Sequence, residues 1–219
     1  MKFDAKTLDV LKNFSTINPS LKFEKGNVLK TISPIKTILS QAHVTTSIEE
    51  TFVIGELGRF MSALSLFQDP EVILGEESLI ITDGKDKLKY LYTPENVITL
   101  PPEKPIAFPA PDVQFTLTNE MFQTARKAMA VLSLQEMALI GEDGKLIVRA
   151  HDAKGLSKDT YSIPIGETDK KFSVVFKAEN LKLMPFDYEV SISSKGISWF
   201  KNDDIQYWIA IESAYSKFE

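Results

Sequence analysis

The side chains that most often perform catalysis are scarce in this sequence. Its 219 residues include two histidines and no cysteine, which excludes disulfides, thiolate zinc sites and cysteine nucleophiles. His43 and His151 fall in or at the end of predicted strands, where a structural histidine is more common than a general base. Asp152 follows His151, but adjacent strand residues point to opposite faces. The sequence therefore predicts no catalytic dyad.

Patterns for phosphate binding and hydrolysis are also missing. Gly55 and Gly58 are too close together for a phosphate-binding loop, and no lysine follows them. The 30 acidic residues are scattered, without the paired arrangement that glycoside hydrolysis uses. We therefore expect a protein that is not an enzyme and that has no cofactor and no metal site.

The charge balance limits the kinds of partner. The chain has 25 basic and 30 acidic residues, so its net charge is −5, whereas a protein held to nucleic acid by bulk charge is usually basic. Any nucleic-acid role must then depend on a local basic surface, or on something other than affinity. The N-terminus has no apolar core of a secretory signal, and no apolar run is long enough to span a membrane. We expect an intracellular soluble protein.

The first half of the chain reads as two helices among short strands. Asp4 is a good N-cap for a helix that ends near residue 18, before Pro19. A second helix fits residues 56–67, with an apolar stripe formed by Leu57, Phe60, Met61 and Leu64. Residues 25–27 predict a hairpin turn, and so does the pair Asp83-Gly84. Strands fit residues 20–24, 27–32, 36–45, 48–54, 71–74, 78–82 and 87–92.

The second half repeats this order. A strand at 112–117 leads into a helix capped by Thr118 or Asn119, and a short helix fits residues 178–184, before Pro185. Asp143-Gly144 is a hairpin signal. Further strands fit residues 134–140, 144–151, 157–165, 172–176, 187–193, 196–201 and 205–211.

Both halves thus read as strand, helix, four strands, helix and three strands. The proline-rich segment between them favours an extended, semi-rigid spacer. We predict an α+β fold with two similar domains at residues 1–93 and 112–219, joined by a connector at 94–111. Each domain would pack two helices on antiparallel sheets, and such a repeat without a catalytic set suggests a scaffold.

Basic side chains recur on the polar faces of these helices. Cations on a helix exterior are often just part of a solvated surface, and that interpretation stays open. The basic face is found in both halves, however, so the helices could bring cations together on one surface. The residues are Lys6, Lys12, Arg59, Arg126, Lys127 and Lys182.

Three segments carry a resemblance to a known family. Residues 10–18 (VLKNFSTIN), 103–109 (EKPIAFP) and 180–188 (NLKLMPFDY) resemble the DNA polymerase sliding clamp of T-even-type bacteriophages, and the likeness covers nearly the whole chain. The resemblance implies a homotrimeric ring that encircles duplex DNA, with the helices on its inner wall. It places Lys12, Arg126 and Lys182 at DNA-facing positions, while Lys6, Arg59 and Lys127 are added from the helical wheels.

The same resemblance implies partners. Edge strands would pair between subunits through Leu88, Tyr90, Tyr92, Thr160, Tyr161 and Ile163. A partner peptide would dock in an apolar groove at the connector, with candidate contacts Ile98, Leu100, Phe108, Tyr215 and Phe218. The expected partners are the DNA polymerase, an ATP-dependent clamp loader and, as a further candidate, transcription machinery. The location would be the cytoplasm of the infected host cell.

Two other interpretations remain. A viral structural protein built from a duplicated domain would share the repeat, the acidity and the lack of an active site. It has no need for basic residues on the same helix faces of both halves. An enzyme with an unusual carboxylate site would require a deep pocket with perturbed acids, and nothing in the sequence indicates one.

Overall fold

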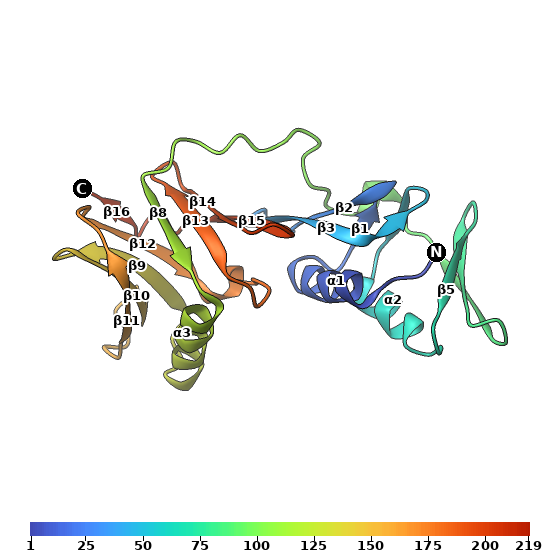
Figure 1. Cartoon of the computed structure of the whole chain (residues 1–219), viewed down its shortest axis with the longest axis horizontal. Coiled ribbons are helices and arrows are strands. Elements are labelled where there is room, and N and C mark those ends of the chain that lie inside the picture. The colour runs from blue at the N-terminus through green and yellow to red at the C-terminus, as the bar shows by residue number, and fades with distance from the viewer. The chain divides into compact units, whose positions relative to one another are not determined.

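The computed structural model describes all 219 residues, and its contacts divide the chain into two compact units. The first unit comprises Met1–Pro105 with Asp204–Gln206, and the second comprises Ile106–Asp203 with Tyr207–Glu219. Both units combine helices with antiparallel strands, which confirms the predicted α+β class (Figure 1). The longest helices have 13 residues, which is too few to span a lipid bilayer.

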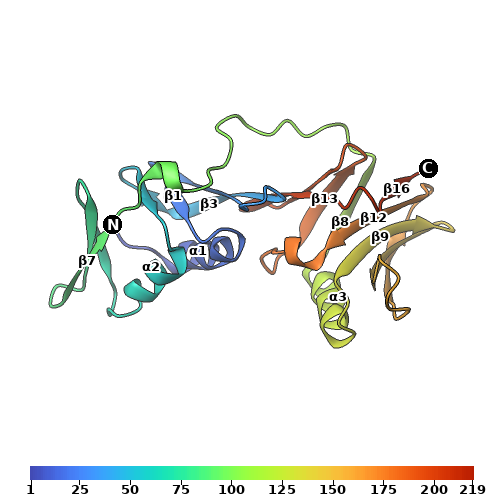
Figure 2. The same cartoon turned by 180° about the vertical axis from the view of Figure 1, so that it is seen from behind.

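In the first unit, helices α1 (Ala5–Ile17) and α2 (Leu57–Leu64) lie beside each other (Figures 1 and 2). The strands form antiparallel pairs β1–β4 and β2–β3 and a three-stranded sheet in the order β5-β6-β7. A short 3-10 helix at Glu95–Val97 follows. The strand bounds are β1 (Leu21–Phe23), β2 (Gly26–Ile32), β3 (Ile38–Ile48), β4 (Phe52–Ile54), β5 (Glu71–Leu74), β6 (Ser78–Thr82) and β7 (Lys87–Leu91).

Aromatic packing fixes α2 against the rest of this unit. Phe60 is fully buried, and its ring lies 5.9 Å from Phe3, 6.2 Å from Phe23 and 5.5 Å from Tyr90, centroid to centroid. Tyr90 belongs to β7, so the Phe60 ring joins α2 to the three-stranded sheet. Burial of such rings is the main favourable term in holding these elements together.

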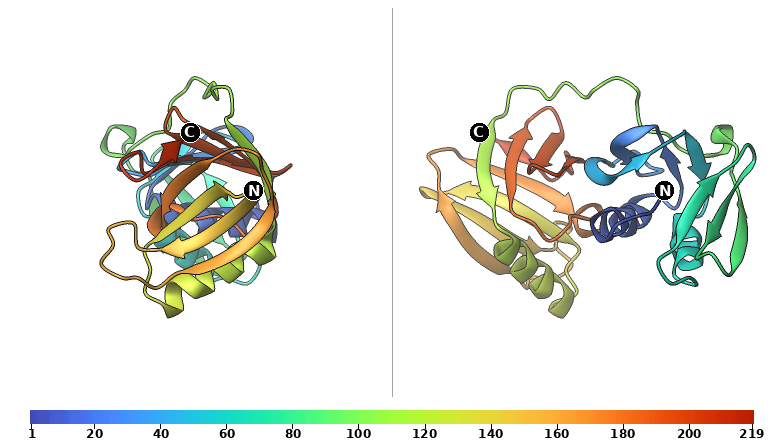
Figure 3. Two further views of the ribbon diagram at one scale, coloured as in Figure 1. Left: turned by 90° about the vertical axis from the view of Figure 1, so that its left-hand side faces the viewer. Right: turned by 45° about the vertical axis from the view of Figure 1, so that its right-hand side comes forward.

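In the second unit, helix α3 (Asn119–Val131) crosses one face of a five-stranded sheet (Figure 3). The strand order in that sheet is β11-β10-β9-β12-β16, and β13 pairs with β8 and β14. Phe122, Ala125 and Met129 are the buried side of α3. The strand bounds are β8 (Val113–Leu117), β9 (Glu136–Glu142), β10 (Lys145–His151), β11 (Tyr161–Glu167), β12 (Phe172–Lys177), β13 (Tyr188–Ser193), β14 (Ile197–Lys201), β15 (Ile205–Ala210) and β16 (Lys217–Phe218).

Two predicted turns are confirmed. Asp143 and Gly144 have φ of 51° and 77°, and the strands they join pair Glu142 with Lys145. This is the two-residue hairpin that Asp-Gly favours, because both turn positions need positive φ. Gly84 has φ of 92° between β6 and β7, where the other hairpin was expected.

The predicted helix at 178–184 is wrong. Only a 3-10 turn at Ala178–Asn180 forms, and Leu181 already leaves the helical region with ψ of 57°. Leu181 and Leu183 are buried while Lys182 between them is half-buried, which is the alternation of an extended chain. Pro185 also disfavours helical geometry at the residue before it. Lys182 therefore does not sit on a helix.

Other expectations also need correction. The turn at 25–27 does not make a hairpin, because β1 pairs with β4 and β2 pairs with β3. No strand precedes α1, although one was expected from the repeat. The strand expected at 157–165 begins only at Tyr161, because the Asp152 carboxylate accepts hydrogen bonds from the Lys154 and Ser157 amides, each at 2.8 Å, and holds a turn there.

Candidate functional site

Helix α1 begins at a densely bonded carboxylate. Asp4 accepts hydrogen bonds from the Thr7 amide at 2.9 Å, the Thr45 hydroxyl at 2.7 Å and the Thr46 hydroxyl at 2.8 Å. Burial alone would raise the pKa of Asp4, but these hydrogen bonds outweigh it and hold the pKa well below its usual range. The charged cap also complements the positive end of the helix dipole.

The two predicted cations of α1 differ in their surroundings. The Lys6 ammonium lies 2.7 Å from the carboxylate of Asp204. Asp204 belongs to the first unit, like Lys6. Lys12 is exposed and takes part in no ion pair. Lys6 therefore shares its charge with a carboxylate, whereas Lys12 presents a full positive charge to solvent.

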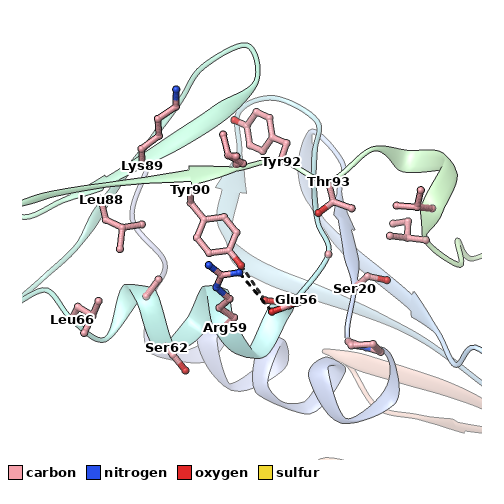
Figure 4. A pocket seen from close by; sticks show the side chains of 16 residues that line it. Ser20, Glu56, Arg59, Ser62, Leu66, Leu88, Lys89, Tyr90, Tyr92 and Thr93 are labelled. Carbon is pink, nitrogen blue, oxygen red and sulfur yellow. Dashed lines mark hydrogen bonds and ion pairs between the residues drawn. The ribbon is translucent and has the colours of Figure 1, made fainter.

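Helix α2 places its single cation beside an aromatic ring. The Arg59 guanidinium lies 5.9 Å from the centre of the Tyr90 ring and 4.0 Å from the Glu56 carboxylate (Figure 4). The Tyr90 hydroxyl donates to the Glu56 carbonyl at 3.4 Å. Burial raises the pKa of Tyr90, and the Arg59 charge opposes that rise. The three residues join the start of α2 to β7.

The same residues border a groove of about 930 Å³ in the first unit. Leu66 and Val97 line it and are 73% and 66% exposed, so the groove has apolar walls open to solvent. The structure thus brings together residues that the sequence assigned to three different roles: DNA contact, subunit contact and peptide contact. They are Arg59, Leu88, Tyr90, Tyr92 and Ile98.

In the second unit, α3 carries two adjacent exposed cations. The Thr118 hydroxyl caps the helix by accepting from the Met121 amide at 3.3 Å. Arg126 lies 5.8 Å from the Phe122 ring centre, and neither Arg126 nor Lys127 takes part in an ion pair. Glu120 is exposed in the first turn of the same helix, where a carboxylate is favourable.

Each unit also contains a sheet whose edge strand is unpaired on its outer side. β7 pairs only with β6, and β11 pairs only with β10. Among the predicted contact residues, Leu88, Tyr90, Tyr92 and Ile163 are half-buried in their own units, whereas Thr160 and Tyr161 are exposed. Thr160 lies one residue before β11. Unpaired strand edges are templates for adding another strand.

The predicted peptide-contact residues occupy several places. Leu100 lines a small hollow of about 190 Å³ with Lys22, apart from the groove that contains Ile98. Phe108 packs on Trp199 at 5.7 Å between ring centres, and Phe218 stacks on Phe172 at 6.4 Å. Tyr215 is 41% exposed. The Lys22 ammonium forms an ion pair with the Glu95 carboxylate at 2.9 Å, which links the start of the connector to β1.

The Nε2 atom of His151 is buried and has no hydrogen-bond partner. His151 is half-buried, and burial lowers its pKa. Its strand neighbour is Glu136, a buried carboxylate that the sequence analysis did not single out. No three histidine or acidic side chains gather in a way that could hold a metal ion.

Comparison with known proteins identifies the family. The second unit matches the family model described as gp45 sliding clamp, C terminal, over residues 114–213. The chain is 34% identical to the sliding clamp of Vibrio phage KVP40, and the match covers 97% of this chain and 100% of that protein. The chain belongs to the sliding-clamp family. The clamp of Enterobacteria phage T4 is 25% identical over 97% of both chains, so the resemblance to clamps of T-even-type phages is confirmed.

Solved structures agree on the fold. The proliferating cellular nuclear antigen of Entamoeba histolytica superposes with a TM-score of 0.68 at 13% identity, covering 96% of this clamp chain and 97% of that one. The Helicobacter pylori β clamp, solved with a DNA ligase peptide, superposes with a TM-score of 0.66 at 15% identity. That match covers 96% of this chain and 66% of the β-clamp chain. At these identities the likeness concerns the fold alone, and it confirms the predicted clamp fold.

Proposed function

We propose that this sliding clamp closes into a homotrimeric ring that encircles duplex DNA and tethers the phage DNA polymerase during synthesis. The observation that carries the proposal is the family relationship, which extends over 97% of the chain and all of a phage sliding clamp. Each subunit would contribute two clamp domains, 1–93 and 112–219, joined by the connector at 94–111. A duplicated structural protein has no reason to show that relationship.

The DNA-facing residues would be the basic side chains of the helices and of the segment after β12. Phosphate contacts carry no sequence information, so cations that reach the backbone hold the duplex without fixing the clamp at one site. Lys12, Arg126 and Lys127 are the strongest candidates, because they are exposed and take part in no ion pair. Lys6, Arg59 and Lys182 complete the proposed set.

The ring would close where the free edge of β7 meets the free edge of β11 of the next subunit. A head-to-tail contact of this kind forms a ring when its rotation closes. The half-buried Leu88, Tyr90 and Tyr92 and the exposed Thr160 and Tyr161, with Ile163, are the proposed contact residues. Retention on DNA would then be topological, because a closed ring leaves only by opening.

The other partners follow from the family. We infer that the polymerase and an ATP-dependent clamp loader dock short apolar segments near the connector, with transcription machinery as a further candidate partner. Ile98, Leu100, Phe108, Tyr215 and Phe218 are the proposed peptide contacts. The clamp itself would be a non-enzymatic processivity factor without a cofactor, and it would act in the cytoplasm of the infected host cell.

Light scattering coupled to size exclusion tests the assembly. The chain mass is 24.6 kDa, so a trimer would weigh about 74 kDa. We expect that mass at micromolar concentration. A mass of one chain across the accessible concentration range would contradict the ring.

A further inference from the structure

The free edge of β11 contains a proline. Pro164 pairs with Ile147 of β10, and proline has no N–H to donate. Within a sheet, proline is tolerated on an edge strand where its nitrogen faces away from the neighbouring strand. The Pro164 nitrogen therefore faces the open side of β11. Because alternate residues of a strand point their backbone groups to the same side, the Ser162 N–H faces that open side too.

The free edge of β7 has the opposite character. The Tyr92 N–H, just past the end of β7, donates to the Glu77 carbonyl at 3.1 Å, so it points toward the β6 side. The backbone N–H and C=O groups of Tyr90 then also face β6. The alternation directs the N–H and C=O groups of Lys87, Lys89 and Leu91 to the open side. This edge has no missing donor.

One antiparallel register brings these groups together. It places Leu91 opposite Ser162 and Lys89 opposite Pro164. β11 has a shift in register between its pairings with Leu146 and Ile147 of β10. If the new strand follows the same shift, Lys87 comes opposite Glu167 and Tyr92 opposite Tyr161. An opposite-charge pair and an aromatic pair directly across two strands are both stabilising.

We propose that β11 of a second copy of this chain adds to β7 in this register, and that Pro164 leaves the joint one hydrogen bond short. The inference rests on the proposed head-to-tail assembly. Leu91 and Ser162 exchange two hydrogen bonds, and the Lys89 N–H donates to the Pro164 carbonyl. The Lys89 carbonyl receives nothing in return and keeps its water. The joint is therefore held less tightly at this point than a complete ladder, which makes it the place where the ring opens.

Cysteine cross-linking tests the register. The chain has no cysteine, so the double variant Tyr92→Cys with Tyr161→Cys can form disulfides only between the introduced thiols. Directly opposite strand residues have the Cβ separation that a disulfide needs. We expect covalent trimers under mild oxidation. The matched control, Tyr92→Cys with Ile163→Cys, is shifted by two residues and should cross-link far more slowly. Faster cross-linking of the control overturns the register.

The exchange of labelled subunits tests the role of the proline. Pro164→Ala restores the N–H, and one added hydrogen bond should slow exchange about five- to tenfold. Pro105→Ala changes an exposed connector proline and should leave the rate unchanged. Ser162→Pro removes a second outward N–H from the β11 edge and should accelerate exchange. Thermal unfolding of each variant checks that its units remain folded.

The outcomes distinguish failure of the proposed ring from failure of the proposed role of Pro164. If the wild-type chain is a monomer, the proposed ring fails and this inference fails with it. If the wild-type chain forms trimers but Pro164→Ala exchanges at the wild-type rate or faster, the ring stands and the role of Pro164 is overturned.

Discussion

Helices α1 and α3 are built alike but differ in their charges. Each has 13 residues, begins at a side-chain cap and buries one apolar side. The cap of α1 is the Asp4 carboxylate, and its Lys6 is ion-paired with Asp204. The cap of α3 is the Thr118 hydroxyl, and its Arg126 and Lys127 are in no ion pair.

This difference shows that equivalent helices of the two units can use their charged side chains for different purposes. In α1, a charged side chain is used to anchor the helix start, and one of two cations is balanced by a carboxylate. In α3, both cations remain available to an anionic partner. If the helices face DNA, the second unit would supply more of the attraction than the first, since unpaired cations release more counterions on binding phosphate.

The largest expected difference lies in the caps. Asp4→Ala removes an acceptor of three or more hydrogen bonds and should lower the free energy of unfolding by about 2 kcal/mol, the upper end for N-caps. Thr118→Ala, the matched change in α3, should cost about 1 kcal/mol. Urea unfolding at pH 7 measures both. Equal losses would remove the distinction between the two caps.

The next effect concerns DNA. The double variant Arg126→Ala with Lys127→Ala should reduce the slope of log K against log salt by about 2, because each phosphate contact contributes about 0.9. The matched pair Lys6→Ala with Arg59→Ala should change it by less than 1, since both residues already lie near carboxylates. Binding to duplex DNA between 50 and 200 mM salt gives the slopes. A larger change in the second pair would reverse the comparison.

The pH dependence of stability should separate the caps again. The pKa of Asp4 is lower in the folded state than in the unfolded chain, so its contribution is complete above about pH 4 and is lost as pH falls further. The deficit of Asp4→Ala relative to the wild-type protein should therefore shrink by about 1 kcal/mol between pH 5 and pH 2. The deficit of Thr118→Ala should stay constant. Chemical unfolding at several pH values tests this, and a constant Asp4→Ala deficit would contradict it.

The smallest effect should come from releasing Lys6. Asp204→Asn removes the carboxylate that pairs with Lys6, so duplex DNA should bind about threefold more tightly in moderate salt. Asp203→Asn removes a neighbouring exposed charge that is in no ion pair and serves as the control. If the affinity for duplex DNA rises equally in both variants, the cause is the change in net charge rather than the release of Lys6.

Local patterns in the sequence were sufficient for several elements. The start of α1 was evident from Asp4, and the β9–β10 hairpin from Asp143-Gly144, because caps and tight turns depend on a few adjacent residues. The apolar spacing of α3 was equally direct, since 3.6-residue periodicity is a local property. The family resemblance came from short segments and is confirmed by the comparisons.

Features that depend on distant residues were not predictable in this way. The pairing of Lys6 with Asp204 joins residues 198 positions apart, and no local signal marks it. The pairing of β1 with β4 displaced a hairpin that residues 25–27 alone would favour. The helix expected at 178–184 failed because burial of Leu181 and Leu183 imposed an extended chain. The significance of Pro164 became visible only when β11 proved to be a free edge.

We propose that the clamp stays on DNA because the closed ring encloses the duplex. The direct measurement is the lifetime of labelled clamp on a nicked circular duplex, loaded with a clamp loader, before and after the circle is cut once. Topological retention predicts a long lifetime on the circle and rapid loss from the linear product, whose ends are open. Equal lifetimes on both forms would contradict the account, because they would show that contact affinity rather than enclosure holds the clamp.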